Sequence, residues 1–111
     1  MTIHLDSDIF ENVKQGTKNI EVRVNDEKRR KLKIGDKIVF LKRPDEKEKI
    51  EAIIENLTYY TDFNELVKDY TIEEIYIEGY TKEEFLNLLK RFYSDEEINK
   101  YGTVAIKFKK I

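Results

Sequence analysis

Residues 16–23 read Gly-Thr-Lys-Asn-Ile-Glu-Val-Arg and decide how the rest of the chain is interpreted. The stretch follows a short helical pattern and opens a strand, in which successive side chains point to opposite faces. One face of this strand carries Ile20, Val22 and Val24. The other carries Glu21 and Arg23, whose Cα atoms are expected to lie about 6.6 Å apart. We expect the apolar face to build the core and the charged face to point outward.

Lys18, Glu21 and Arg23 allow two interpretations. Opposite charges along a strand are common and contribute only a few tenths of a kcal/mol, so an ordinary solvated face is the simpler one. The alternative is a pocket in which Lys18 lies in the turn left by Gly16 and reaches toward Glu21. These three residues are therefore the first candidates for a binding site.

The pattern Gly16-x-Lys18-x-x-Glu21-x-Arg23 after a first helix resembles the signature of the ASCH domain family, a branch of the PUA-like β-barrels. Three later segments resemble the turn-then-strand segment, the last helix and the final strand of that family, namely Leu32–Phe40, Arg91–Tyr93 and Tyr101–Ile106. The octapeptide alone is moderately specific, whereas the ordered set, which covers nearly the whole chain, is much stronger.

The resemblance implies a cleft on the barrel that receives RNA or a modified nucleoside. It also implies an alternative activity, because one branch of the family is an amidohydrolase that removes the acetyl group from N4-acetylated cytidine. That branch uses a lysine, a threonine and a glutamate, of which Lys18 and Glu84 match the first and the last. Glu21 occupies the threonine position, so a hydroxyl nucleophile is missing and another mechanism would be needed.

Reasoning from the residues leaves both roles open. Glu21 can serve as a general base on water, with Lys18 or Arg23 stabilising an oxyanion. Those two cations favour the charged carboxylate, however, which suits binding more than proton abstraction. Glu84 also fits the third position of a capping box that begins at Thr81, which is a structural role.

Further candidate binding residues come from a basic run and from aromatic side chains. Arg29 and Arg30 lie in a segment with four cations in five residues just past the candidate site, and such a run is either a solvated helical turn or a phosphate-contacting patch. Tyr59 and Tyr93 are candidates for stacking on a base. His4 has no motif around it, and we expect it to be structural or exposed.

Composition excludes several classes of protein. The chain has no cysteine and one histidine, so we expect no metal site, and its four glycines leave no phosphate-binding loop that would hold a nucleotide cofactor. No apolar run is long enough for a membrane span, and the start lacks the features of a signal peptide, so we expect a cytoplasmic protein without a membrane partner.

Charge is distributed unevenly along the chain. Residues 1–43 hold eleven Lys or Arg and seven Asp or Glu, whereas residues 61–97 hold four and eleven. A uniformly basic coat is thereby excluded, but a local basic face is not. The acidic second segment leaves a third hypothesis open, a module that binds protein partners through it.

Hydrophobic periodicity predicts five strands, near residues 3–5, 19–24, 37–41, 49–59 and 103–108. The register of the apolar residues shifts at Ile53-Ile54, which predicts a bulge. A helix is expected before Gly16, and capping boxes that begin at Thr71, Thr81 and Ser94 predict three helices after residue 70. We therefore expect an α+β fold in one domain over residues 1–111. It would be a small mixed β-barrel of about five or six strands, PUA-like, with an early helix and a helical insert before the last strand.

Overall fold

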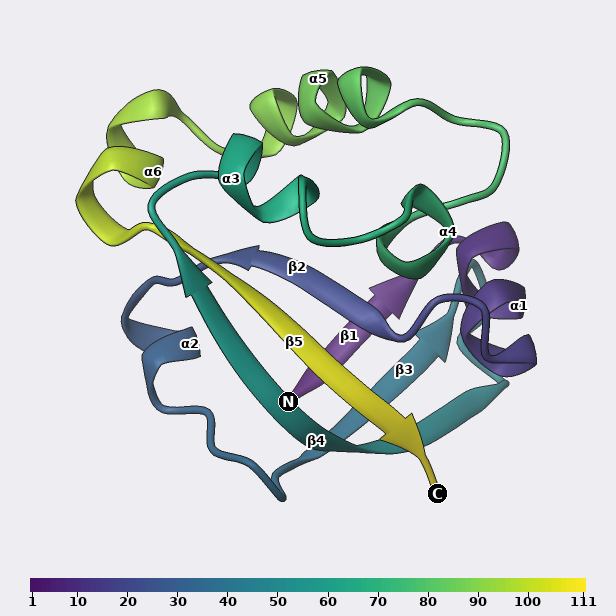
Figure 1. Ribbon diagram of the computed structural model, residues 1–111. Helices are drawn as coiled ribbons and strands as arrows, with labels where there is room; N and C mark the ends of the chain where they lie inside the picture. Colours follow the sequence, from purple (N-terminus) through teal and green to yellow (C-terminus); the bar gives the residue numbers. More distant parts are fainter.

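The computed structural model describes all residues from 1 to 111, and its elements alternate between a curved sheet and short helices (Figure 1). In chain order they are β1 (Thr2–Leu5), α1 (Ser7–Gln15), β2 (Ile20–Val24), α2 (Glu27–Arg30), β3 (Lys37–Lys42), β4 (Lys49–Tyr60), α3 (Phe63–Val67), α4 (Ile72–Ile75), α5 (Lys82–Phe92), α6 (Asp95–Tyr101) and β5 (Thr103–Lys110). The five predicted strands and the three capping-box helices are confirmed.

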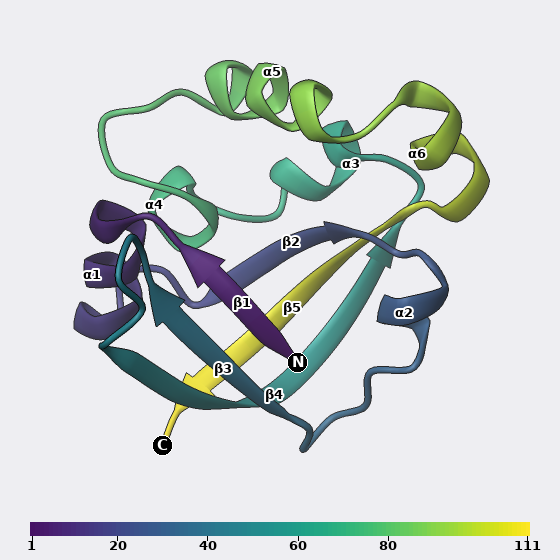
Figure 2. The same ribbon diagram turned by 180° about the vertical axis from the view of Figure 1, so that it is seen from behind.

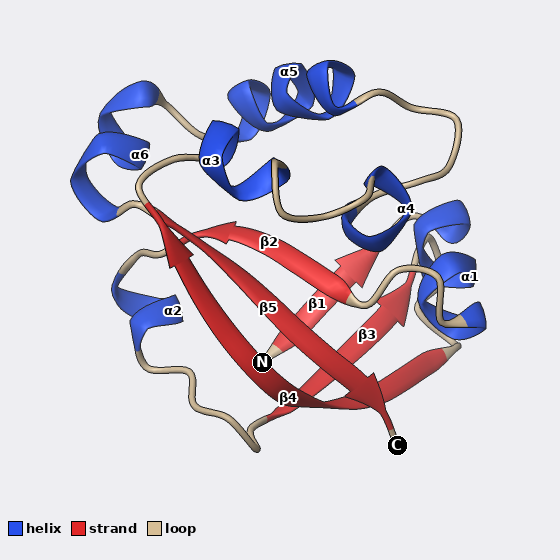
Figure 3. Ribbon diagram, viewed as in Figure 1, coloured by secondary structure: helices blue, strands red, loops and turns tan.

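The five strands form one sheet in the order β1-β3-β4-β5-β2, which curls into a half-barrel (Figure 3). β1 pairs with β3 in parallel, and all other neighbours are antiparallel. This mixed α+β architecture is consistent with the small PUA-like barrel that was expected. Unlike a closed barrel, however, the sheet leaves β1 and β2 as edges that are not hydrogen-bonded to each other.

The long strand β4 joins the two halves of the sheet. Its first half pairs with β3 and its second half with β5, and the ladder to β5 shifts register between Ile54 and Asn56. The bulge predicted at Ile53-Ile54 is thus confirmed within one or two residues. An extra residue in one strand increases its local twist, which lets the sheet curl.

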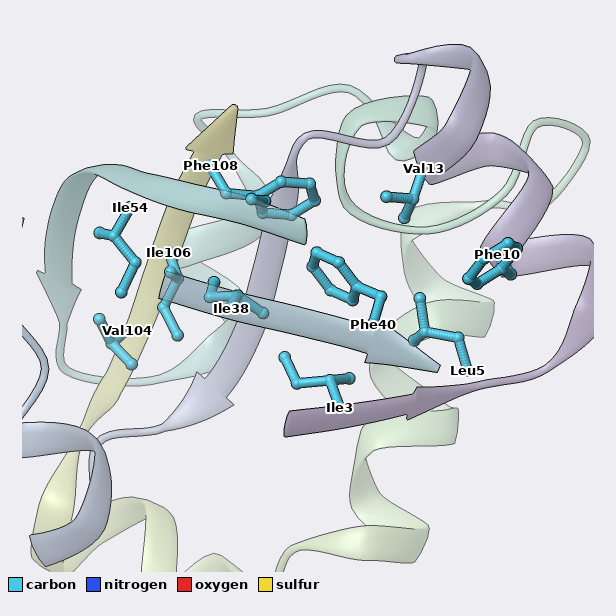
Figure 4. Close-up of a cluster of buried hydrophobic side chains, with 11 residues drawn as sticks. Ile3, Leu5, Phe10, Val13, Ile38, Phe40, Ile54, Val104, Ile106 and Phe108 are labelled. Atoms are coloured by element: carbon cyan, nitrogen blue, oxygen red, sulfur yellow. The ribbon is translucent and has the colours of Figure 1, made fainter. Parts of the chain in front are cut away.

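Two hydrophobic clusters form the core, one on each side of the sheet where β2 and β5 lie. The concave face holds the first cluster, in which the rings of Phe40 and Phe108 lie 4.8 Å apart (Figure 4). On the convex side, α3 to α6 cover β2, β5 and the end of β4 and contribute Phe63, Leu66 and Phe85 to the second cluster. β5 serves both clusters, since alternate residues of a strand point to opposite faces.

The apolar face of β2 builds core as expected, but the expectation that its charged face points outward is wrong. Glu21 and Arg23 pair with Ile106 and Val104, which belong to the concave cluster, so the charged side chains point into the half-barrel. The apolar residues of β2 face the helical layer instead. The helical insert covers the apolar face of β2. The charged face is therefore the one that points into the half-barrel, and it is not a solvated surface.

The helical insert begins and ends at defined positions. Asp62 caps α3, and Thr71, Thr81 and Ser94 each form a complete capping box with the glutamate three residues later. Gly102 ends the insert with φ +70°, and a Cβ there would lie 2.8 Å from the carbonyl oxygen of Tyr60. Only glycine fits this turn, which returns the chain to the sheet as β5. None of the helices combines the length and the apolar character that crossing a membrane requires.

Candidate functional site

A cleft of about 510 Å³ lies where the half-barrel is open, between the edge strands β1 and β2. Its floor carries charged side chains from β2 and from the turn before it, and its opposite wall comes from α4 and α5. In Figure 1 the helix α5 runs above the sheet on this side, with α1 and α2 at opposite ends. The cleft is therefore bounded by the two edge strands of the sheet, which are not paired with each other, and by α4 and α5.

Lys18 reaches the floor of the cleft because of the way α1 ends. Gly16 adopts a left-handed conformation with φ +87°, and its backbone N–H donates to the carbonyls of the last helical turn. The Lys18 side chain is 3% exposed. Its Nζ donates to the carbonyl oxygens of Ile20 at 2.6 Å and Ile75 at 3.0 Å, and it lies 3.7 Å from Glu21 Oε1. The ammonium group thereby ties β2 to α4.

Acceptors of the chain itself surround the Lys18 ammonium group. Two of its three donors are used by the carbonyls of Ile20 and Ile75, and the Glu21 carboxylate forms an ion pair with it at 3.7 Å. Burial lowers the pKa of Lys18, while the negative charge of Glu21 opposes that shift. Lys18 thus acts within the chain as a buried anchor beneath Glu21.

Glu21 is the buried acceptor of the site. Its side chain is 9% exposed, and its Oε1 accepts from the Val22 N–H at 3.3 Å. Its Oε2 lies 3.6 Å from Arg23 Nη2, is buried, and accepts no hydrogen bond. Buried carboxylate oxygens are normally hydrogen-bonded, so this one has capacity left for a donor that enters the cleft.

Arg23 supplies the second cation. Its side chain is 25% exposed at the cleft wall. Burial lowers the pKa of Arg23, but the charges and hydrogen-bonding groups of Glu21 and Tyr93 outweigh it, so the net shift is upward and the guanidinium stays charged. Tyr93 follows α5 and also lines the cleft, with its ring 5.7 Å from that of Phe63.

The two arginines of the basic run differ in their position relative to the cleft. Arg29 lines the cleft, and its Nη1 lies 3.5 Å from Asp26 Oδ2, while its buried Nε has no hydrogen-bond partner. Arg30 does not line it: its Nε donates to the carbonyl of Asn25, and its guanidinium lies 5.4 Å from the centre of the Tyr101 ring.

Two other sequence candidates lie outside the cleft lining. Tyr59 is 55% exposed near the end of β4. Glu84 is exposed on α5, where its carboxylate accepts from the Thr81 N–H at 3.0 Å in the capping box. The structure thus brings together Lys18, Glu21, Arg23, Arg29 and Tyr93 and leaves Arg30, Tyr59 and Glu84 apart.

Sequence reasoning missed several residues of the cleft. Arg43 reaches it because β1 and β3 are parallel, so that the Arg43 N–H donates to the Leu5 carbonyl at 2.9 Å. His4 also lines it, and its Nδ1 lies 2.6 Å from Glu46 Oε1. Phe92 lines the rim and is 68% exposed. No local pattern marks Arg43 or His4, whereas Phe92 is adjacent to the predicted Tyr93.

The cleft combines an apolar wall with a charged floor. Apolar and aromatic side chains from α5 face a floor that offers one unsatisfied carboxylate oxygen and several cationic donors. No group of three or more His, Asp or Glu side chains is arranged to hold a metal ion.

The fold and this cleft define a small PUA-like half-barrel with a charged floor at its open edge. A family model described as the ASCH domain matches residues 3–111, so the chain belongs to the ASCH domain family. At the level of the family, this membership supports RNA binding as the general role of the domain.

Two solved structures resemble the chain along its whole length. The crystal structure of the hypothetical protein PH0355 has 34% sequence identity and a TM-score of 0.85, with 99% of this chain and 97% of that chain covered. The solution NMR structure of protein PF0455 from Pyrococcus furiosus has 28% identity and a TM-score of 0.74, with 100% and 98% covered. No curated protein matches the chain.

Proposed function

We propose that the cleft binds RNA or a modified nucleoside, with a base placed against Glu21 and the charge of the ligand met by cations around it. The observation that carries this proposal is the buried Oε2 of Glu21, which accepts no hydrogen bond although the Glu21 side chain lines the cleft. A carboxylate accepts from an exocyclic amine, as it does from cytosine N4.

The surroundings of Glu21 support a role in binding. Lys18 and Arg23 lie 3.7 and 3.6 Å from its two oxygens, so cations flank the carboxylate on both sides. Tyr93 adds an aromatic ring on the opposite wall. Such a ring can stack on a base, whose π-face contributes about 1–3 kcal/mol.

Replacing Arg23 tests the electrostatic part of this proposal. Arg23→Ala should weaken the binding of single-stranded RNA and flatten the dependence of affinity on salt, because a cation in the cleft adds to the release of counterions from the bound strand. Fluorescence anisotropy over a series of salt concentrations measures both. Lys28→Ala is the matched control, since Lys28 is exposed and does not line the cleft. Unchanged affinity and slope in Arg23→Ala would refute the role of this cleft.

An amidohydrolase acting on N4-acetylated cytidine or a related acylated nucleoside is the second candidate. The contact between Lys18 and Glu21 favours it, because it pairs a cation with a carboxylate on the floor of the cleft. The exposed position of Glu84 in its capping box favours it less.

A turnover assay on N4-acetylcytidine separates the two candidates. The hydrolase predicts product that disappears in Lys18→Ala and Glu84→Gln, with circular dichroism confirming that both variants fold. The binding module predicts no product, even at high protein concentration, and binding that is unchanged in Glu84→Gln.

A further inference from the structure

We propose that the cleft receives an internal nucleotide of a single-stranded RNA, with one flanking phosphate at Arg29 and the other at Arg43. This inference rests on the proposed function and specifies its ligand as a continuous strand instead of a free nucleoside. It is carried by the positions of the two arginines and by the hydrogen-bonding groups that the chain leaves unused between them.

The two arginines mark opposite ends of the cleft. Arg29 belongs to α2, which follows the end of β2. Arg43 follows the end of β3, beside the end of β1 and the start of α1. Figures 1 and 2 show α2 at one end of the half-barrel, and α1 with the tip of β3 at the other. Both arginines line the cleft, so a ligand that contacts both must extend through it.

Both arginines keep donors for an anion. The Arg29 side chain is 18% exposed, and its buried Nε has no hydrogen-bond partner, although Asp26 holds its Nη1. Arg43 is exposed and its side chain forms no ion pair, whereas its backbone N–H donates to the Leu5 carbonyl. Guanidinium groups bind phosphate through two parallel N–H donors, which suits both positions.

Between these two cationic ends lies an acceptor. The unpartnered Oε2 of Glu21 belongs to a side chain that is 9% exposed. In the order of these elements the cleft therefore offers the donors of Arg29 and Arg23, the acceptor of Glu21 and the donors of Arg43. One internal nucleotide has the complementary order of phosphate, base with N–H donors, and phosphate.

Phe92 provides a place for a neighbouring base. Its ring is 68% exposed at the rim of the cleft, although it is a large apolar side chain at the end of α5. Aromatic rings at such positions stack on bases of any sequence and are typical of single-strand binding. A ligand limited to one nucleoside would leave this ring unused.

Isothermal titration calorimetry with three ligands tests the inference, using cytidine, cytidine 5′-monophosphate and the trinucleotide CpCpC. We expect the trinucleotide to bind about tenfold more tightly than the mononucleotide at low salt, because it adds a second phosphate contact. Each phosphate contact on a single strand contributes a slope of about −0.7 to log K against log salt, so two contacts give about −1.4.

Variants of the two arginines test whether each one contacts a phosphate of the trinucleotide. Arg29→Ala and Arg43→Ala should each weaken trinucleotide binding and reduce the slope by about 0.7. Lys28→Ala and Lys47→Ala are matched controls, because both lysines are exposed neighbours that do not line the cleft. Both controls should behave as the wild type does.

The outcomes separate this inference from the proposed function. If all three ligands bind with equal affinity and Glu21→Gln weakens them, the cleft binds a nucleoside and the inference is wrong, while the proposed function stands. Equal binding of a double-stranded RNA would also overturn the inference. If none of the three ligands binds, the proposed function is wrong and the inference falls with it.

Discussion

Lys18, Glu21 and Arg23 form a chain of charges in which each member has a different task. Lys18 donates to two carbonyls of its own chain, and one oxygen of Glu21 accepts no hydrogen bond. Arg23 is the most exposed of the three. The sequence predicted this grouping because the three residues lie within one turn and one strand. It did not predict the burial of Lys18, because the Ile75 carbonyl that holds it lies 57 residues away.

Lys18→Met tests whether Lys18 is a structural anchor. Removing one partner from a buried ionic contact leaves the other without compensation and costs about 3 kcal/mol or more. We expect the free energy of unfolding, measured by urea denaturation, to fall by about that amount. Lys28→Met, at an exposed position, should change it by less than about 0.5 kcal/mol. A similarly small change in Lys18→Met would contradict the anchoring role.

At the scale of elements, local signals predicted most of what is found. The capping boxes at Thr71, Thr81 and Ser94 specify helix starts through contacts within four residues, so their helices could be predicted from the sequence. The orientation of β2 could not, because both of its faces are buried and the choice depends on which side the distant helical insert covers.

Tyr60 connects two of these elements, since its hydroxyl at the end of β4 donates to Asp69 Oδ2 at 2.7 Å, just after α3. Tyr60→Phe removes a hydrogen bond to a charged group and should lower the free energy of unfolding by about 1.5 kcal/mol at pH 7. Urea denaturation measures this loss, and Tyr59→Phe, on an exposed side chain, is the control.

The same contact makes a pH-dependent contribution. Burial, together with the hydrogen bonds to Tyr70 and Asp69, raises the pKa of Tyr60 in the folded state. Above pH 10 the unfolded chain releases this proton while the folded chain retains it, so the stabilising contribution of Tyr60 is present below pH 10 and is lost as the pH rises. The stability difference between the wild type and Tyr60→Phe should therefore shrink above pH 10. A constant or growing difference would show that the shift is absent.

At the scale of the whole molecule, the uneven charge of the sequence and the pairing of the strands together gather positive charge in the cleft. The basic first segment supplies every Lys and Arg of the cleft, whereas the acidic segment forms most of the helical layer, whose helices α4 and α5 form the opposite wall. We therefore expect a polyanion to contact the cleft on the side of β2 and the ends of β1 and β3. The sequence predicted the charge asymmetry, but Arg43 became visible as a cleft residue only through the parallel pairing of β1 with β3.

The central claim is that the free oxygen of Glu21 recognises a base with an exocyclic amine, and Glu21→Gln tests it most directly. The measurement is the affinity of the wild type and the variant for oligo(C) and oligo(U), by fluorescence anisotropy. Urea denaturation checks that the variant is folded. We expect the wild type to prefer oligo(C) by about 1–3 kcal/mol, and the variant to lose most of that preference while keeping the phosphate-dependent part of its affinity. Equal affinities of the wild type for the two strands, or a preference that survives in Glu21→Gln, would contradict the account.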